Sequence, residues 1–429
     1  MAAWVSGLTL DDIPAPVQHA ALRSLIDTIG VMIAANRHPL LAKVNQLAES
    51  QYRDGPCGAV GGQRLSGIGA ALVNGTAAHA FDFDDTSYTG IMHGSAVSLP
   101  AVLAAAEFSD TSGEEFLTTF IVALEATYAI AVMGTDAQYL KGRWTSGTMG
   151  MPAAAAGAAR ALGLDADQTA TAIGLATVEA FGIRAMFGTD AKPLLSGRAS
   201  AAALSAALAA AEGITGPHGA FESPRGYIGL INDGIADPRG LADLGTIWRL
   251  IEPGIFLKRF PLCSAAHAPA DAIEAIMKES AASPEQIAHV VCEVPQVVAV
   301  SLVYDSPTSP QEAQFSLPFA VACMAIHGRI GLEHLSSDCL ADARMRSLMT
   351  KVRMAKVDDL ADDPDAPEGC RLTVSFANGT SHVNEIRVPK GMPQNPLDDD
   401  EIADKFRCCT SYAGWSTSDT EDLLDRLWA

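Results

Sequence analysis

Titratable side chains are concentrated in the short segment 79–95, which reads HAFDFDDTSYTGIMHGS. Three carboxylates, from Asp82, Asp84 and Asp85, stand there among apolar neighbours. A carboxylate that loses its water needs a partner or a ligand, so such a run is costly as a purely structural feature. His93 titrates near neutral pH and suits acid–base chemistry. The segment is therefore predicted to form one wall of an active site.

The functional hypothesis for this segment gives substrate binding to Asp82 and Thr86 and proton transfer to His93. His79 is predicted to be a buried core histidine whose hydrogen bonds are satisfied. The other two carboxylates receive no chemical role. The alternative is a solvated acidic loop whose aspartates cap neighbouring helices.

Lys192 is a second candidate, since it precedes a proline at the start of an apolar, alanine-rich stretch. Proline suits the first turn of a helix, where the backbone N–H groups and the helix dipole also favour anions. Lys192 is thus a candidate carboxylate ligand or, if desolvated, a base. A surface lysine at a helix start is the alternative.

The segment 256–271 places Lys258, Cys263 and His267 around a proline, ahead of an apolar helix. Cys263 and His267 lie about one turn apart if the helix has begun between them. No oxyanion-hole or glycine-elbow signature accompanies this pair, which disfavours covalent thiol catalysis. Lys258 is a candidate for neutralising a substrate carboxylate.

A fourth candidate segment, 139–148, contains Tyr139 and Arg143 four residues apart. The two would share a face if the segment is helical, although Gly142 weakens that interpretation. Arginine suits bidentate binding of a carboxylate. A loop with an aromatic anchor is the alternative.

The composition limits the class of protein. The 429 residues are 48% hydrophobic and 18% charged, with a formal net charge of −21. Such a chain is globular rather than disordered, and its length favours two domains. The acidic balance argues against nucleic acid or an anionic membrane as a partner. The N-terminus has no basic region before an apolar core, which predicts no signal peptide and a cytoplasmic location.

Familiar cofactor motifs are missing from the sequence. There is no G-x-G-x-x-G after a strand, no phosphate-binding G-x-x-x-x-G-K-[ST] and no H-E-x-x-H. The eight cysteines form no C-x-x-C pair, so zinc fingers and a disulfide framework are not expected. Free thiols are predicted instead.

The order of apolar patterns predicts a mainly α protein with a second, α+β domain. Alanine-rich helical patterns dominate residues 1–253, which are predicted to form a large helical domain completed by 392–429. Residues 254–391 are predicted to form a small α+β domain, in which Asn378-Gly379 marks a hairpin. Its four β-like runs are 289–294, 351–357, 371–376 and 382–388.

Taken in this order, the segments resemble the MmgE/PrpD family, whose members include 2-methylcitrate dehydratase, cis-aconitate decarboxylase and iminodisuccinate epimerase. The resemblance spans nearly the whole chain. It is carried by 82–86 with His93, Lys192-Pro193 with Gly197, 258–261 with His267, 312–318, and 391–397 with 405–407. It implies a large helical domain, a smaller α+β domain, a site between them, a homodimer, a small polycarboxylate substrate, and no metal or organic cofactor.

The resemblance also implies roles for individual residues. Asp82 and Thr86 match substrate-binding positions, His93 and His267 match proton-transfer positions, and Lys192 matches a carboxylate ligand or base. The predicted catalytic residues are His93, His267, Lys192 and Tyr139. The predicted substrate-binding residues are Asp82, Thr86, Arg143, Trp144, Ser146, Lys258 and Cys263.

The chain departs from the family pattern at Trp144. Many family lyases carry Gly-Phe-His-Pro-Thr where this chain reads Gly142-Arg-Trp-Thr-Ser146, so Trp144 stands where an active-site histidine is expected. Tryptophan cannot exchange a proton at neutral pH. Arg143 would add a carboxylate ligand instead, and Tyr139 would offer a hydroxyl from a nearby turn.

These expectations converge on a cofactor-independent enzyme that moves a proton at the carbon next to a carboxylate of a small di- or tricarboxylate. A lyase, either a dehydratase or a decarboxylase, is the leading prediction. An epimerase or isomerase of the iminodisuccinate epimerase type is the alternative, because the same intermediate precedes both outcomes. The third possibility is a non-catalytic carboxylate-binding relative in which Trp144 fills the pocket.

Overall fold

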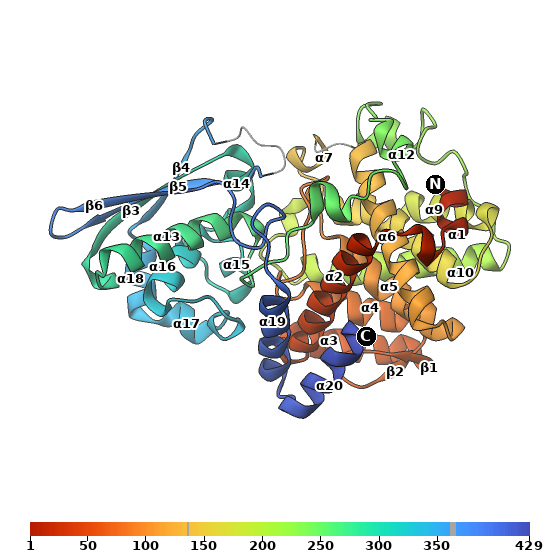
Figure 1. Cartoon of the computed structure of the whole chain (residues 1–429), viewed down its shortest axis with the longest axis horizontal. Helices are drawn as coiled ribbons and strands as arrows, with labels where there is room; N and C mark the ends of the chain where they lie inside the picture. The colour runs from red at the N-terminus through yellow and green to blue at the C-terminus, as the bar shows by residue number, and fades with distance from the viewer. Residues whose placement is uncertain (135–136, 361–365) are drawn as a thin grey trace.

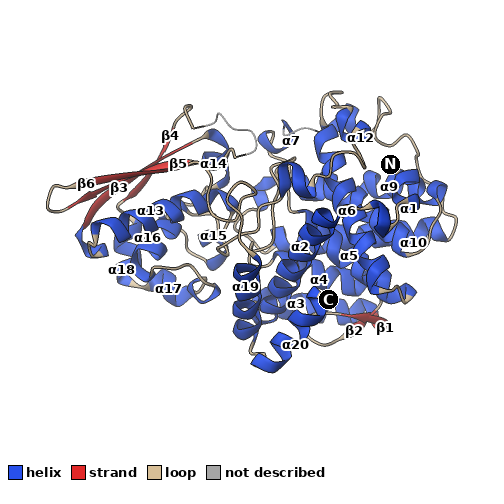
Figure 2. Cartoon of the chain, in the orientation of Figure 1, coloured by secondary structure: helices blue, strands red, loops and turns tan. Residues whose placement is uncertain are grey.

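The computed structural model describes residues 1–134, 137–360 and 366–429, which form two lobes side by side (Figure 1). One lobe is almost entirely helical, and the other contains a sheet with helices packed on it (Figure 2). The predicted mainly α fold with a second, α+β part is therefore confirmed.

The helical lobe uses the first part of the chain. Its helices are α1 (Ala2–Gly7), α2 (Ala15–Ala34), α3 (Pro39–Tyr52), α4 (Gly67–His79), α5 (Gly94–Ser109), α6 (Gly113–Gly134), α7 (Ala137–Leu140), α8 (Met151–Ala161), α9 (Ala166–Glu179), α10 (Ala191–Ala211), α11 (Tyr227–Ile231) and α12 (Arg239–Ala242). Short helical turns are η1 (Leu10–Asp12), η2 (Ala35–Arg37), η3 (Ser146–Gly150), η4 (Arg184–Met186) and η5 (Leu250–Gly254). Strands β1 (Arg53–Gly58) and β2 (Arg64–Leu65) form an antiparallel ribbon that the sequence patterns did not predict.

The second lobe mixes helices and strands. Its elements are η6 (Ser264–Ala266), α13 (His267–Ser280), η7 (Pro284–Gln286), β3 (Ile287–Val294), α14 (Gln296–Ser301), α15 (Pro310–Ala313), α16 (Leu317–His327), η8 (Leu332–His334), α17 (Ser337–Ala341), α18 (Ala343–Met349), β4 (Val352–Lys356), β5 (Cys370–Phe376) and β6 (Ser381–Ile386). The strand order is β4-β3-β5-β6, with β3 and β4 parallel and the other pairs antiparallel. All four predicted strands are present. The predicted hairpin joins β5 to β6, and Gly379 in its turn has a φ of +85°.

The C-terminal helices return to the helical lobe. Helices α19 (Asp399–Ala413) and α20 (Thr417–Trp428) pack against α2. A buried ion pair fixes this contact, with Lys405 Nζ 2.5 Å from Asp27 Oδ1. A helix from the first part of the chain and the last two helices thus lie side by side although most of the sequence separates them (Figure 1).

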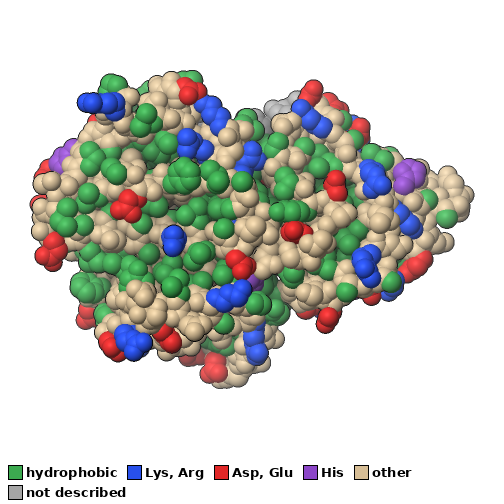
Figure 3. All heavy atoms as spheres, turned by 180° about the vertical axis from the view of Figure 1, so that it is seen from behind, with side chains coloured by type: hydrophobic (Ala, Val, Ile, Leu, Met, Phe, Trp, Pro, Cys, Tyr) green, Lys and Arg blue, Asp and Glu red, His purple; other side chains and the backbone are tan. Residues whose placement is uncertain are grey.

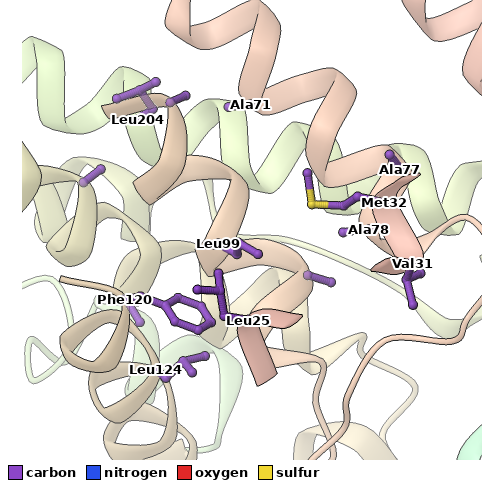
Figure 4. Close-up of a cluster of buried hydrophobic side chains, with 14 of the residues drawn as sticks. Leu25, Val31, Met32, Ala71, Ala77, Ala78, Leu99, Phe120, Leu124 and Leu204 are labelled. Carbon is purple, nitrogen blue, oxygen red and sulfur yellow. The ribbon is translucent and has the colours of Figure 1, made fainter. Parts of the chain in front are cut away.

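Close helix packing brings α4 and α10 together and so positions the residues at their ends. A Cβ on Gly197 in α10 would lie 2.2 Å from the backbone oxygen of Leu72, and one on Gly75 would lie 2.8 Å from Gly197 Cα. Only glycine fits such an approach. The interior around α4 is filled by apolar side chains from several helices, among them Met32 and Leu99 (Figure 4).

Two helices, α6 and α10, have the length and hydropathy of a membrane-crossing segment. The most apolar windows of these helices are 83% and 50% buried inside the protein. Their apolar character therefore serves packing within the helical lobe, since a helix that is apolar on most sides suits a core.

Candidate active site

Asp82 lies at the centre of a buried cluster that three separate parts of the chain create. It follows the end of α4, Lys192 is in the first turn of α10, and Lys258 follows η5. Asp82 Oδ2 accepts a hydrogen bond of 2.9 Å from Lys192 Nζ, and Oδ1 accepts one of 2.5 Å from Lys258 Nζ. The three residues are 2%, 3% and 0% exposed, respectively. The structure thus brings together three of the predicted site residues.

The ion pairs keep this buried carboxylate charged. Burial alone would raise the pKa of Asp82, but the two lysine ammonium groups hold it well below its usual range. Burial would lower the pKa of Lys258, and the carboxylates of Asp82 and Asp84 raise it instead. An ammonium group has three N–H donors, and the described contacts use two on each lysine. One donor on each lysine is therefore left for a ligand.

The backbone of Asp82 supports this geometry. Its φ of +49° lies in the left-handed region, which costs a residue other than glycine about 1–3 kcal/mol. In this conformation the backbone oxygen of Asp82 also accepts a 2.6 Å hydrogen bond from Lys258 Nζ. The local strain is offset by contacts to two cations.

His79 connects Lys192 to a second carboxylate. His79 Nδ1 lies 2.8 Å from Asp84 Oδ1, and His79 Nε2 lies 2.7 Å from Lys192 Nζ. Since an ammonium group can only donate, His79 Nε2 accepts and the ring carries its proton on Nδ1. Burial lowers the pKa of His79 and keeps the ring neutral. Sequence analysis placed this residue in the core, and the structure places it both in the core and in the cluster.

His93 is the imidazole with a free nitrogen. Its Nδ1–H donates to the backbone oxygen of Asp85 at 3.0 Å, and Asp84 Oδ2 lies 2.9 Å from the same nitrogen as a charged neighbour. Nε2 therefore carries a lone pair, and it faces Asp82 Oδ1 at 3.8 Å. Burial lowers the pKa of His93 to about 4, which makes the ring neutral at pH 7. The side chain is 13% exposed, so it is not sealed from solvent.

Asp84 has a role that sequence analysis did not assign. Burial would raise its pKa, but contacts with His79 and His93 hold it well below its usual range. The carboxylate thus fixes the orientation and the tautomer of both imidazole rings. Asp85, also left without a chemical role, does remain structural, since its carboxylate accepts hydrogen bonds from the hydroxyl and backbone N–H groups of Ser95 at the start of α5. Nothing in the local pattern distinguishes these adjacent aspartates, because the choice depends on tertiary contacts.

Thr86 and Ser146 support the backbone around His93. Thr86 pairs through its N–H and C=O groups with Phe256, and its Oγ1 donates to the backbone oxygen of Met92 at 3.2 Å. Ser146 Oγ accepts a hydrogen bond of 2.9 Å from the N–H of His93. Both predicted substrate-binding hydroxyls therefore lie at the site and are engaged by the protein backbone.

His267 has no free ring nitrogen. Its Nε2 accepts from the N–H of Phe260 at 3.2 Å, and its Nδ1 lies 3.3 Å from the backbone oxygen of Cys263. The ring is fully buried against Phe256 and Phe260, and burial lowers its pKa to about 3. This arrangement fixes the turn that follows Lys258. The proton-transfer role predicted for His267 lacks a nitrogen to perform it.

Tyr139 and Arg143 do not share a helical face. Helix α7 ends at Leu140, and the φ of +92° at Gly142 turns the chain. The Tyr139 hydroxyl is engaged with Ser301 Oγ at 2.7 Å, while Arg143 is half-buried and its backbone bridges to Ile183. Neither residue has a described contact with the Asp82 cluster.

Trp144 lies against the cluster with an unused donor. The indole is 2% exposed, and its ring centroid is 5.7 Å from that of His79. Its Nε1 has no hydrogen-bond partner among the residues that the structure describes. A buried donor without a partner is costly, so it suits a ligand that brings an acceptor. Cys263, also predicted to bind substrate, is a buried thiol, and burial raises its pKa to about 12.

Glu368 is a buried carboxyl group that sequence analysis missed. Glu368 Oε2 accepts a hydrogen bond of 2.6 Å from the Tyr88 hydroxyl, and burial raises its pKa. Both groups come within electrostatic reach of Cys263. The residue follows an acidic stretch typical of a solvated loop, so the sequence contains no signal for its burial.

The cluster suits an anion better than a metal ion. Donor atoms of His79, Asp82, Asp84 and His93 all lie within 4.8 Å of one another, as metal ligands do. However, the Asp82 carboxylate already contacts two ammonium groups, and both oxygens of Asp84 face imidazole nitrogens. A dication would have to displace or oppose those lysines, whereas a carboxylate would meet them favourably.

Comparison with known proteins agrees with the motifs. The model of the MmgE/PrpD N-terminal domain matches residues 1–236, and that of the C-terminal domain matches residues 260–429. A cis-aconitate decarboxylase of Aspergillus terreus (strain NIH 2624 / FGSC A1156) is 27% identical over 99% of this chain and 92% of its own length. Cis-aconitate decarboxylase of Mus musculus is 27% identical over 96% of this chain and 86% of its own length. The chain belongs to the MmgE/PrpD family of enzymes.

Proposed function

We propose that this protein is a lyase that acts on a small tricarboxylate or dicarboxylate by proton transfer at the carbon next to a carboxylate. The observation that carries the proposal is the pair of buried lysines on Asp82, next to the neutral imidazole of His93. The relatives named as cis-aconitate decarboxylases make cis-aconitate the first candidate substrate.

Substrate binding uses the lysines. The free N–H donors of Lys192 and Lys258 bind a substrate carboxylate, while Asp82 keeps both ammonium groups in place. Removing a proton or CO₂ next to that carboxylate moves negative charge onto its oxygens. Preorganised cations in a buried site stabilise this charge more than water does.

His93 moves the proton. Its Nε2 lone pair is available because Nδ1–H is held by Asp84 and by the backbone oxygen of Asp85. Asp84 also stabilises the imidazolium that forms when Nε2 takes a proton, as the buried aspartate of a catalytic triad does. A neutral imidazole whose partner is an ionised carboxylate is a competent general base at pH 7. These steps use only side chains of this protein.

The positions of the imidazoles favour a lyase over an epimerase. Epimerisation needs two proton-transferring groups on opposite faces of one carbon. The rings of His79 and His93 are neighbours, with centroids 4.4 Å apart, and His79 has both nitrogens engaged. His267 likewise has no free nitrogen. Of these three histidines, only His93 has a lone pair available on its ring.

NMR in D₂O with cis-aconitate, citrate and other di- and tricarboxylates tests the proposal. A lyase loses CO₂ or water from one substrate, and His93→Ala lowers its kcat by at least ~10²-fold. Lys43→Met, at an exposed surface ion pair, is the matched control for Lys192→Met and keeps wild-type kcat. Deuterium exchange without loss of mass would establish an epimerase. Binding without exchange or product would identify a non-catalytic relative.

We also propose that two copies of the chain associate through the helical lobe. Hydrophobic side chains gather in broad areas on the reverse face of this lobe (Figure 3). Val178, Phe181 and Ile183 are 72%, 56% and 47% exposed, and such apolar surface is typical of an interface. Light scattering should give twice the 44.7 kDa of one chain, and Phe181→Asp should yield the monomer. Phe108→Asp, at another exposed phenylalanine, is the control, and a monomeric wild type would refute the proposal.

A further inference from the structure

A second cluster of metal-ligating side chains lies in the α+β lobe, on elements that carry none of the active-site residues. Cys323 and His327 are one turn apart on α16, and His334 ends η8. One donor atom from each of these residues lies within 4.8 Å of the other two. The imidazole centroids of His327 and His334 are 4.6 Å apart.

A fourth donor stands beside this group. The thiol of Cys339 in α17 neighbours that of Cys323, outside the three residues whose donor atoms lie within 4.8 Å of one another. Both cysteines are free thiols. Two thiols and two imidazoles on three neighbouring elements form a Cys₂His₂ set, which is a common donor set of structural zinc sites. In the sequence these residues have the spacing C-x₃-H-x₆-H-x₄-C, which contains no C-x-x-C pair. The site could therefore not be recognised from the sequence.

The fold builds this arrangement by reversing the chain after α16. Gly328 ends the helix with a φ of +69°, which brings the following residues back over the last turn. Cys323 Sγ then lies 3.7 Å from the backbone oxygen of Arg329. The short η8 turn places His334 against His327. The cluster therefore closes the loop between α16 and α17.

We propose that Cys323, His327, His334 and Cys339 form a structural site for a thiophilic divalent cation, with Zn²⁺ as its best match. Zinc binds thiolate at about 2.3 Å and imidazole at about 2.0–2.1 Å in a tetrahedron. The ligand atoms of such a site are roughly 3.3–3.8 Å apart. The donors of Cys323, His327 and His334 would close around the ion by about 1 Å, and the Cys339 side chain would have to rotate further to complete the tetrahedron.

The surroundings of His334 suit a metal ligand. Its Nδ1 lies 2.9 Å from the N–H of Gly331 and 3.5 Å from Glu333 Oε1, so Nε2 is the nitrogen left for a metal. When Nε2 binds the ion, the ring proton must sit on Nδ1, so the hydrogen bond that Nδ1 accepts from the Gly331 N–H is exchanged for one that Nδ1–H donates to the Glu333 carboxylate, as zinc-bound histidines commonly do with outer carboxylates. His334 and Cys323 are buried, whereas His327 is exposed and provides the route of entry.

This site differs electrostatically from the cluster around Asp82. There, two buried ammonium groups contact the carboxylate that would have to bind an ion. Beside the Cys₂His₂ set, the guanidinium of Arg329 is paired with Glu333 at 2.7 Å. Two thiolates would balance the charge of Zn²⁺, so binding releases two protons.

Metal analysis of the full-length protein tests the proposal. The protein is stripped with a chelator, then titrated with Zn²⁺ against a chromophoric competitor and with Co²⁺ for its thiolate charge-transfer absorption. We expect one ion per chain, a thiolate–cobalt band and a higher melting temperature with Zn²⁺. Cys339→Ser and His327→Ala should each weaken Zn²⁺ binding at least ~10-fold. His327 is exposed, so that variant tests the site without disturbing the core.

Matched variants separate this site from the active site and from unrelated thiols and imidazoles. Cys57→Ser changes a buried thiol on β1, and His218→Ala changes an exposed histidine in the helical lobe; both should keep full Zn²⁺ affinity. His93→Ala should also bind one Zn²⁺, and its failure to do so would assign the ion to the active site and overturn the proposal. Unchanged Zn²⁺ affinity in both Cys339→Ser and His327→Ala would overturn it as well. So would a Cys323–Cys339 disulfide in the freshly purified protein.

Discussion

Replacing Asp84 with asparagine tests the contacts that we propose prepare His93 for catalysis. Asp84 offers one carboxylate oxygen to His79 Nδ1 at 2.8 Å and the other to His93 Nδ1 at 2.9 Å. The amide of Asp84→Asn keeps the size but turns one acceptor into a donor. The N–H of one imidazole must then face the N–H of the asparagine amide.

The structure indicates which of the two imidazole rings changes its tautomer. His79 Nε2 accepts from Lys192 at 2.7 Å, so His79 must keep its proton on Nδ1. His93 has no such restraint and is expected to move its proton to Nε2, where the lone pair of the base was. A hydrogen bond to a charged group contributes about 1.5–3 kcal/mol, and a wrong histidine tautomer costs up to ~10⁴-fold in a catalytic triad. The backbone oxygen of Asp85, 3.0 Å from His93 Nδ1, favours the Nδ1–H tautomer and opposes this shift, so we expect kcat to fall by about 10²–10⁴-fold.

The assay combines rates with a direct view of the tautomer. Loss of CO₂ or water gives kcat, and ¹⁵N NMR of labelled histidine reports which ring nitrogen carries the proton. Asp85→Asn is the matched control, because that neighbouring carboxylate holds Ser95 rather than an imidazole side chain, and its kcat should stay within a few-fold of wild type. A folded Asp84→Asn enzyme with kcat within about threefold of wild type, and with His93 still protonated on Nδ1, would refute this reasoning.

Three further predictions concern the charges and packing around the site. Lys258→Met leaves a buried carboxylate with one ammonium partner, so kcat/KM should fall at least ~10²-fold and urea unfolding should show a loss of about 3–5 kcal/mol; a loss no larger than that of Lys43→Met would contradict the ion-pair argument. Gly197→Ala places a Cβ 2.2 Å from a backbone oxygen of α4 and should cost about 1–3 kcal/mol, seen by calorimetry as a lower melting temperature. Burial lowers the pKa values of His93 and His267 to about 4 and about 3, below the usual 6.5. As the pH falls, the two rings therefore take up protons in the unfolded chain at a higher pH than in the folded protein. Stability should therefore be full above pH 6.5 and decline as the pH falls toward 4, and a stability flat over that range in urea titrations would show that these rings are not buried in the neutral form.

The sequence by itself determined the class of fold and the segments that form the site. Alanine-rich periodicity specifies helices, and Asn378-Gly379 specifies a hairpin, because both depend on neighbours only a few residues away. The crowding of carboxylates in 79–95 predicted a functional segment, since so many desolvated charges need compensation. Lys192 and Lys258 were predicted from their positions beside prolines near helix starts, and the structure places both on one carboxylate.

The parallel pairing of β3 with β4 and the short ribbon of β1 and β2 lay beyond local patterns. Parallel strands pair through a long connection, and β1 and β2 contain glycine, proline and charged residues that are not typical of strands. Neither pairing is encoded within a few neighbouring residues. Such elements are decided when distant segments pack.

Only the tertiary structure decided which side chain takes which role at the site. Asp84 and Asp85 are adjacent and chemically identical, yet one meets two imidazoles and the other meets Ser95. Both ring nitrogens of His267 are hydrogen-bonded to backbone groups, whereas one ring nitrogen of His93 is free. The types of residues and their spacing determine which chemistry is available. Hydrogen-bond partners, tautomer and burial select the group that performs it, and these depend on segments far apart in the chain.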